Sequence, residues 1–145
     1  HHLVDGDLTT TASFSLSQKN RQQQVDIRVR EPFTARSVIL RPSNGFFMAN
    51  LTVAAWVKGE YRIVAEGKYD RRKNAANVGP IPNGAVALSL PPTSSNRFRV
   101  TVSDYRTGRG DQGTEFSEIE ILSAPRVEYA VEKQLGKMHP TPSPK

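Results

Sequence analysis

The sequence of 145 residues contains no cysteine, one tryptophan and three histidines, and each shortage excludes a kind of chemistry. Without cysteine there is no disulfide framework, no thiolate metal site and no cysteine nucleophile. The histidines stand near the two ends, at positions 1, 2 and 139, so neither a histidine general base nor a Ser/His/Asp triad is expected. We therefore expect that this chain is not an enzyme by itself.

Long apolar runs are also missing. No run approaches the roughly 20 residues that span a bilayer, so we expect no membrane insertion. The net charge of +6 allows attraction to acidic polymers, but the basic residues are scattered. The densest basic cluster, residues 71–73, is only three residues long. No basic stripe and no RNP-like motif is present, so we expect no nucleic-acid binding.

Short runs that alternate apolar and polar residues follow one another along the chain, and helix signals are nearly absent. Proline cannot donate to a strand ladder, so Pro32 and Pro91-Pro92 are expected to end strands. The expected strands are a short edge strand near Phe14 and runs within 25–30, 35–41, 50–57, 60–66, 86–90, 98–102 and 116–122. About eight antiparallel strands predict an all-β fold, a β-sandwich or jelly roll.

The clearest hairpin turns at Lys58-Gly59, and the alternation after it predicts inward side chains at Tyr61, Ile63 and Ala65. Residues 1–125 are expected to form the sandwich. Residues 126–145 are expected to form a short helix or extended tail, with a proline-rich linker to a neighbouring domain.

An oxygen-rich turn opens the chain at residues 3–10. Asp5 and Asp7 flank a glycine, and threonines follow, which suits a hard cation such as Ca²⁺. Glu118, in the last apolar run, is the natural further donor. The alternative is a capped turn without metal. Glu118 and Glu120 share one face of their strand, and this spacing predicts a solvated outer face rather than a catalytic carboxylate pair.

Sugar recognition needs a flat apolar ring against the C–H face of the sugar and charged or amide groups against its hydroxyls. Loops on a rigid β scaffold are the usual place for such groups. The alternatives are buried aromatics and ordinary solvated arginines. Trp56 lies opposite the inward face of its strand and either packs on a second layer or forms an exposed platform. The candidate carbohydrate-binding residues are Tyr69, Arg71, Tyr105, Arg106 and Trp56.

Four motifs together resemble a discoidin or coagulation-factor 5/8 type C domain over residues 3–122. They are Asp5-Gly6-Asp7-x-x-Thr10, Lys58-Gly59-Glu60-Tyr61, Arg97-Phe98-Arg99-Val100 and Ser117-Glu118-Ile119-Glu120-Ile121. This family belongs to the galactose-binding-like β-sandwiches, which include many carbohydrate-binding modules. The resemblance implies a structural Ca²⁺ with the ligands Asp5, Asp7, Thr10 and Glu118.

Residues 126–142 resemble the joint that follows such a domain in large secreted bacterial glycoside hydrolases similar to α-L-rhamnosidases. This resemblance implies a non-catalytic carbohydrate-binding or accessory domain of a glycoside hydrolase that is secreted, periplasmic or at the bacterial cell surface. Its partners would be a glycan, such as a plant or host polysaccharide, and the catalytic domain of the same chain. The alternative is a structural docking or adhesive module without a sugar site.

Overall fold

The computed structural model describes residues 12–14, 22–42, 47–70, 84–107 and 114–128. These ranges form antiparallel strands in the order β1-β6-β2-β5-β3-β4 and contain no helix, so the all-β prediction is confirmed. The strands are β1 (Ala12–Phe14), β2 (Gln22–Pro42), β3 (Phe47–Val57), β4 (Glu60–Asp70), β5 (Val86–Thr107) and β6 (Thr114–Leu122). The described part of the chain thus has six strands where we expected about eight.

Two very long strands account for the lower number. β2 has 21 residues and β5 has 22, and each merges two runs that we expected to be separate. The prediction that Pro32 and Pro91-Pro92 end strands is wrong. The pairing of β2 with β5 shifts register between Arg28 and Phe33 and again between Ala35 and Ser37, and the prolines lie at these irregularities. A proline is tolerated at a bulge because the ladder needs no N–H there.

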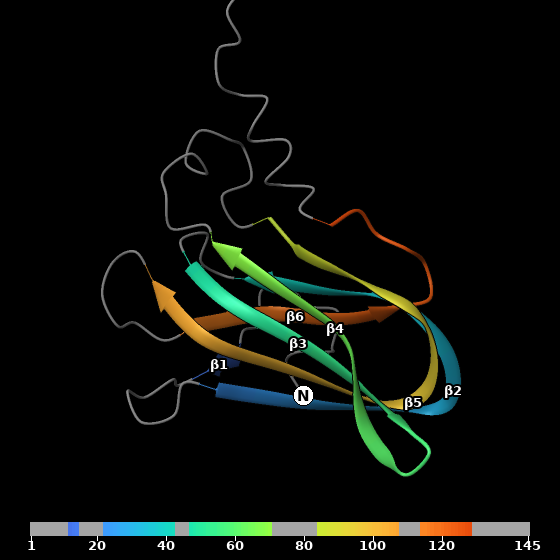
Figure 1. Cartoon of the computed structure of the whole chain (residues 1–145). Helices are drawn as coiled ribbons and strands as arrows, with labels where there is room; N and C mark the ends of the chain where they lie inside the picture. The colour runs from blue at the N-terminus through green and yellow to red at the C-terminus, as the bar shows by residue number, and fades with distance from the viewer. Residues whose placement is uncertain (1–11, 15–21, 43–46, 71–83, 108–113, 129–145) are drawn as a thin grey trace, which may run out of the picture.

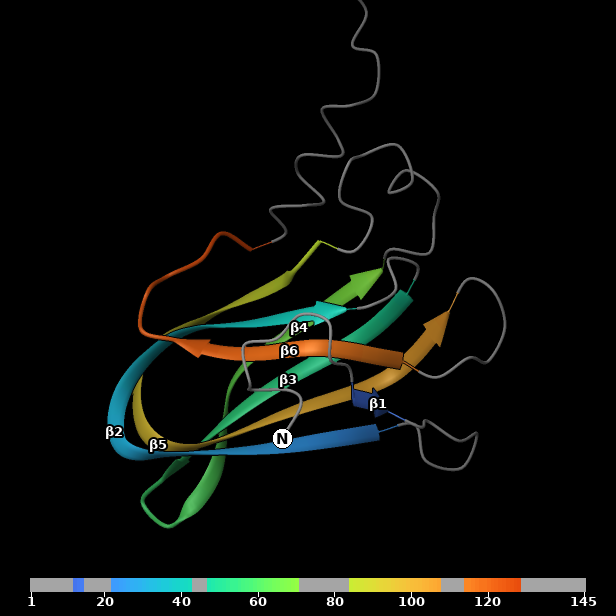
Figure 2. The ribbon, with the colours of Figure 1, turned by 180° about the vertical axis from the view of Figure 1, so that it is seen from behind.

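The bends in β2 and β5 fold the sheet into two layers, as Figures 1 and 2 show from opposite sides. The front layer contains β3, β4, the first part of β2 (22–30) and the last part of β5 (97–107). The back layer contains β1, β6, the last part of β2 (37–42) and the first part of β5 (86–90). The β-sandwich prediction is confirmed in this architecture.

The β3–β4 hairpin forms where we expected it. Lys58 and Gly59 both have positive φ, 53° and 87°, which is the signature of a two-residue type I′ turn. The register then shifts between Val53 and Ala54. This bulge reverses which face of the sheet the first side chains of β4 point toward. Contrary to our prediction, Ile63 points outward with 63% of its surface exposed, and Tyr61 is partly exposed.

Apolar side chains from both layers fill the space between them. Phe98, Leu40 and Phe116 are among the largest fully buried residues. Val38, Leu40 and Ile39 are all buried, so the second half of β2 is covered on both faces. Since a buried apolar side chain contributes about 1.5–3 kcal/mol, this core is the main source of stability.

The segment after β6 folds back over the outer surface of the back layer. Ser37 Oγ donates to the carbonyl oxygen of Ala124 at 2.8 Å, and Ser89 Oγ donates to that of Arg126 at 3.1 Å. The backbone N–H of Ser89 donates to Glu128 Oε1 at 2.7 Å, so the segment occupies the edge of β5. Residues 126–128 are not helical, and the remainder of the predicted C-terminal helix lies outside the described residues.

Candidate carbohydrate-binding surface

The four predicted calcium ligands are described only in part. Asp5, Asp7 and Thr10 lie outside the described residues. Glu118 lies on β6 opposite Arg41 and is 4% exposed, so the prediction that it faces solvent is wrong. Glu120 fits that prediction better: it is partly exposed and accepts a 3.0 Å hydrogen bond from Nε of Arg41. Within the described ranges, no group of three or more His, Asp or Glu side chains is placed to hold a metal.

Tyr69 is a core residue rather than a surface residue. Its ring is 1% exposed, and its hydroxyl donates a 2.7 Å hydrogen bond to the carbonyl oxygen of Ala87 on β5. The predicted sugar contact by Tyr69 is incompatible with this burial. Tyr69 stands among charged residues in the sequence, which suggested a loop. β4 instead continues as far as Asp70, and the side chain of Tyr69 points into the sandwich.

The remaining predicted sugar ligands lie at two ends of the molecule. Arg71 lies outside the described residues, immediately after the end of β4. Tyr105 is partly exposed and Arg106 exposed near the end of β5, where Arg106 pairs with Met48. Trp56 is near the other end of β3, beside Arg97. Arg97 and Arg106 are nine residues apart along β5, which corresponds to roughly 25–30 Å. The structure therefore does not bring Trp56 and Arg106 into one site.

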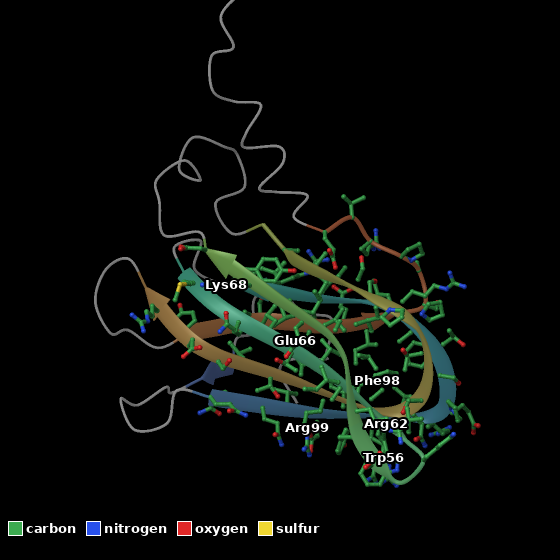
Figure 3. All side chains as sticks on the ribbon, in the orientation of Figure 1. Trp56, Arg62, Glu66, Lys68, Phe98 and Arg99 are labelled. Carbon is green, nitrogen blue, oxygen red and sulfur yellow. The ribbon has the colours of Figure 1, made fainter. Side chains whose placement is uncertain are left out.

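Trp56 lies on the outer surface of the front layer and is partly exposed. Its ring meets the ring of Tyr61 edge-on, with centroids 5.0 Å apart and an interplanar angle of 75°. The guanidinium carbon of Arg97 lies 5.5 Å from the Trp56 ring centroid. Figure 3 shows Trp56 with Arg62 close to the β3–β4 turn. These contacts fix the indole in place while part of it remains open to a ligand.

Arg99 extends the same surface. Its guanidinium carbon lies 4.0 Å from the Tyr61 ring centroid. Arg99 pairs with Ala54 on β3, so its side chain reaches over β3 to Tyr61 on β4. Arg99 Nε and Nη2 donate to Asp26 Oδ1 and Oδ2 at 2.7 and 2.9 Å. The hydrogen bond from Arg99 lowers the pKa of Asp26 below its ordinary value of 3.8, although partial burial opposes the shift. Asp26 in turn raises the pKa of Arg99, mainly through that hydrogen bond.

We call the set Trp56, Tyr61, Arg97 and Arg99 the Trp56 platform. The sequence predicted Tyr61 in the core and gave no binding role to Arg97 or Arg99. The alternation in residues 97–102 indicated an outward face, but only the register across β5, β3 and β4 brings these four side chains together. The sequence carries no direct signal for that register.

The platform offers binding chemistry. Aromatic rings pack against sugar C–H groups, and guanidinium groups donate to hydroxyls and carboxylates. The described residues include no histidine or cysteine that could act as a general base or nucleophile. No helix among them has the length and apolarity needed to cross a bilayer.

No protein-family model matches the chain, and no curated protein matches its sequence. Solved structures do match. The CBM32 of AlyQ in complex with 4,5-unsaturated mannuronic acid has a TM-score of 0.62 and 17% identity, over 85% of this chain and 84% of that chain. Truncated AlyQ with CBM32 and alginate lyase domains has a TM-score of 0.63 and 16% identity, over 87% of this chain and 29% of that chain.

Two further structures have similar scores. A pectin-binding carbohydrate-binding module has a TM-score of 0.62 and 14% identity, over 87% of this chain and 81% of that chain. CpGH89CBM32-5 from Clostridium perfringens, in complex with GalNAc-β-1,3-galactose, has a TM-score of 0.58 and 14% identity, over 84% of this chain and 81% of that chain. The chain therefore shares the β-sandwich fold of these solved modules, two of which are CBM32 domains. This likeness confirms the β-sandwich fold that the discoidin resemblance implied.

Proposed function

We propose that this chain is a non-catalytic carbohydrate-binding module. The observation that carries the proposal is the fixed, partly exposed ring of Trp56, with Arg97 over it, on a CBM32 fold. A ring held in this way loses little conformational entropy when a sugar packs on it. Tyr105 and Arg106 are proposed as a second group of sugar contacts at the opposite end of the front layer. Arg71, which lies outside the described residues, is proposed as a further sugar contact.

Affinity electrophoresis against a panel of soluble polysaccharides, followed by calorimetry on the best ligand, tests the proposal. We expect Trp56→Ala to weaken binding roughly two- to twelvefold, since aromatic stacking contributes about 0.5–1.5 kcal/mol. Val127→Ala is the matched control, because Val127 is 64% exposed and lies after β6, in the segment that covers the back layer. If Arg106→Ala removes binding and Trp56→Ala does not, the ligand binds at the other end of the layer.

A docking role is the second candidate. Ile63 is 63% exposed and lies opposite Ala54 on the front layer, beside the platform. A contiguous apolar patch on a sheet face marks contact with another domain, here the catalytic domain of the same chain, and such a contact would bury Ile63. The absence of a signal with any polysaccharide, together with binding of the separately produced catalytic domain, would favour docking over sugar binding.

We also propose a structural Ca²⁺ held by Asp5, Asp7, Thr10 and Glu118. Glu118 supports the proposal, because it is 4% exposed on β6 and carboxylate oxygens are ligands that a hard cation prefers. In such a site Asp5 would contribute through its backbone. The ion would tie the opening turn to β6.

The parent chain is proposed to be a carbohydrate-active enzyme that is secreted, periplasmic or exposed on a bacterial surface. AlyQ, in which a CBM32 and an alginate lyase domain share one chain, is an example of such an arrangement. A glycoside hydrolase similar to α-L-rhamnosidases is the more specific form of the proposal, and it rests on residues 126–142 alone.

A further inference from the structure

Two arginines face each other across the β2–β5 pair. Arg28 and Arg97 are partners in the antiparallel register, two residues beyond the pair formed by Asp26 and Arg99. Directly opposed residues have Cα atoms only about 4.5–5.5 Å apart. Arg28 is exposed and Arg97 partly exposed, so both side chains are available on the outer surface of the front layer. We call Arg28 and Arg97 the arginine pair.

The arginine pair has no carboxylate partner among the described residues. Asp26 bonds Arg99, and Glu60 bonds Arg62 at 2.7 Å, so the nearby acids in the register are already used. Like charges placed directly opposite each other on a sheet destabilise it. One anion bound between the two strands would remove that repulsion and accept charge-assisted hydrogen bonds from both guanidinium groups.

An aromatic ring lies beside the arginine pair. The Arg97 guanidinium is 5.5 Å from the Trp56 ring centroid, so a ligand that bonds Arg97 also reaches the indole. Tyr61 holds the edge of the indole, Arg99 covers Tyr61, and Asp26 fixes Arg99. This chain of contacts orders the ring before a ligand arrives. The surface therefore combines a place for an anionic group with a place for an apolar ring face.

We propose that the arginine pair and Trp56 bind a uronic acid residue of an acidic polysaccharide, with its carboxylate on Arg28 and Arg97 and its pyranose ring against Trp56. A hexuronate carries both parts in one residue: a carboxylate at the ring edge and a face of C–H groups. The inference rests on the proposed function and adds the ligand class and the position of the site, on a sheet face rather than at the loop end. The net charge of +6 favours the approach of a polyanion.

The test compares polygalacturonate with the same polymer after full methyl esterification, which keeps the sugar and removes the charge. Calorimetry at low salt is run on the wild-type chain and on Arg28→Gln, Arg97→Gln and Trp56→Ala. Arg126→Gln is the matched control, because it removes the same charge from an exposed side chain beside Ser89 of the back layer. Thermal melts establish that each variant is folded.

We expect polygalacturonate to bind at least tenfold more tightly than its methyl ester. We expect each arginine-pair variant to lose about tenfold in affinity, because each removes charge-assisted hydrogen bonds, while Arg126→Gln stays within twofold. Arg97→Lys should lose less affinity than Arg97→Gln but still bind more weakly than the wild-type chain, since an ammonium group cannot form the two parallel hydrogen bonds of a guanidinium.

Each alternative result overturns the inference in a recognisable way. Equal binding of the acid and the ester, with unchanged affinity in the arginine variants, leaves a carbohydrate-binding module whose site lies elsewhere. Dextran sulfate or polyuridylate binding the arginine pair as tightly as polygalacturonate shows a general anion surface instead of a uronate site. Failure to bind any glycan overturns the proposed function itself.

Discussion

The hydroxyl of Tyr69 on β4 donates a 2.7 Å hydrogen bond to the backbone carbonyl of Ala87 on β5, and so joins the front layer to the edge of the back layer. Tyr69 is 1% exposed, and the hydrogen bond that its hydroxyl makes is partly buried. Tyr69→Phe keeps the ring and removes the donor. We expect a loss of about 1–2 kcal/mol in the free energy of unfolding, since the carbonyl is left without its partner.

Urea denaturation of wild-type and Tyr69→Phe chains measures that loss, and calorimetry on the best polysaccharide ligand provides the control. Sugar affinity should not change, because the side chain is buried. A variant with unchanged stability and lost sugar binding would contradict the structural role.

Gly67 lies on the inward side of β4, where neighbouring side chains leave little room for a Cβ atom. A Cβ at this position would lie 3.0 Å from Leu88 Cδ1 and 3.0 Å from Tyr69 Cε2. Tyr69 is held by its hydrogen bond and cannot move away easily, so we expect Gly67→Ala to destabilise the fold by about 1–3 kcal/mol. The double variant Gly67→Ala/Leu88→Val should recover part of this loss in a double-mutant cycle. Strict additivity of the two substitutions would show that Leu88 is not the obstacle.

The arginine pair predicts a variant that is more stable and binds less well. Arg28→Gln removes one of two like charges in a directly opposed pair, and we expect a gain of about 0.2–1 kcal/mol at low salt. The gain should shrink at high salt, where exposed charges are screened. Thermal melts at two salt concentrations measure it. A lower melting temperature would indicate that Arg28 makes a stabilising contact in the free protein.

Asp26 predicts a pH dependence of stability. The folded chain lowers the pKa of this carboxyl group, chiefly through the hydrogen bond from Arg99, so below neutral pH the unfolded chain binds more protons. The stabilisation is complete above the ordinary pKa of 3.8 and is lost as the pH falls through the lower folded pKa. The effect should be small because the pair is largely exposed.

Urea melts of wild-type and Asp26→Asn chains, from neutral pH down to about pH 2, measure this linkage. The wild-type chain should be the more stable above the ordinary pKa of 3.8, and the two should converge at the acid end. A difference that stays constant across the whole range would mean that ionisation of Asp26 does not contribute.

The proposed Ca²⁺ site is tested through Glu118. We expect Ca²⁺ to raise the melting temperature of the wild-type chain relative to EDTA, because a ligand that binds only the folded state stabilises it. Glu118→Gln should abolish the shift. Glu120→Gln, two residues along the same strand and partly exposed, should retain it. A wild-type melting curve that is identical in Ca²⁺ and EDTA would overturn the site.

Parts of the fold were predictable from the sequence because they depend on local chemistry. Lys58-Gly59 predicted the hairpin turn. The alternation within residues 98–102 predicted a strand there, and Phe98, Val100 and Val102 are its buried side. Pro32 misled the strand boundaries, because whether a proline ends a strand or lies at a bulge depends on the partner strand.

The candidate surface was predictable only at Trp56. Its neighbours Arg97 and Tyr61 come from strands whose relative register is set by the packing of the whole sandwich. A bulge after Val53 reversed the expected orientation of Tyr61 and Ile63. Burial of Tyr69 depended on how far β4 extends, and local alternation does not fix that length.

The sharing of β2 and β5 between both layers also determines how the protein can fold. Asp26 meets Arg99 across 73 residues of chain, and Ser37 meets Ala124 across 87. Closing loops of this length precedes most of the stabilising contacts, so folding should be slow, on the millisecond-to-second scale of other all-β domains. Neither layer can form without both long strands. During synthesis β2 therefore lacks its β5 and β6 partners until those strands have emerged, and this interval is when the chain is most exposed to aggregation.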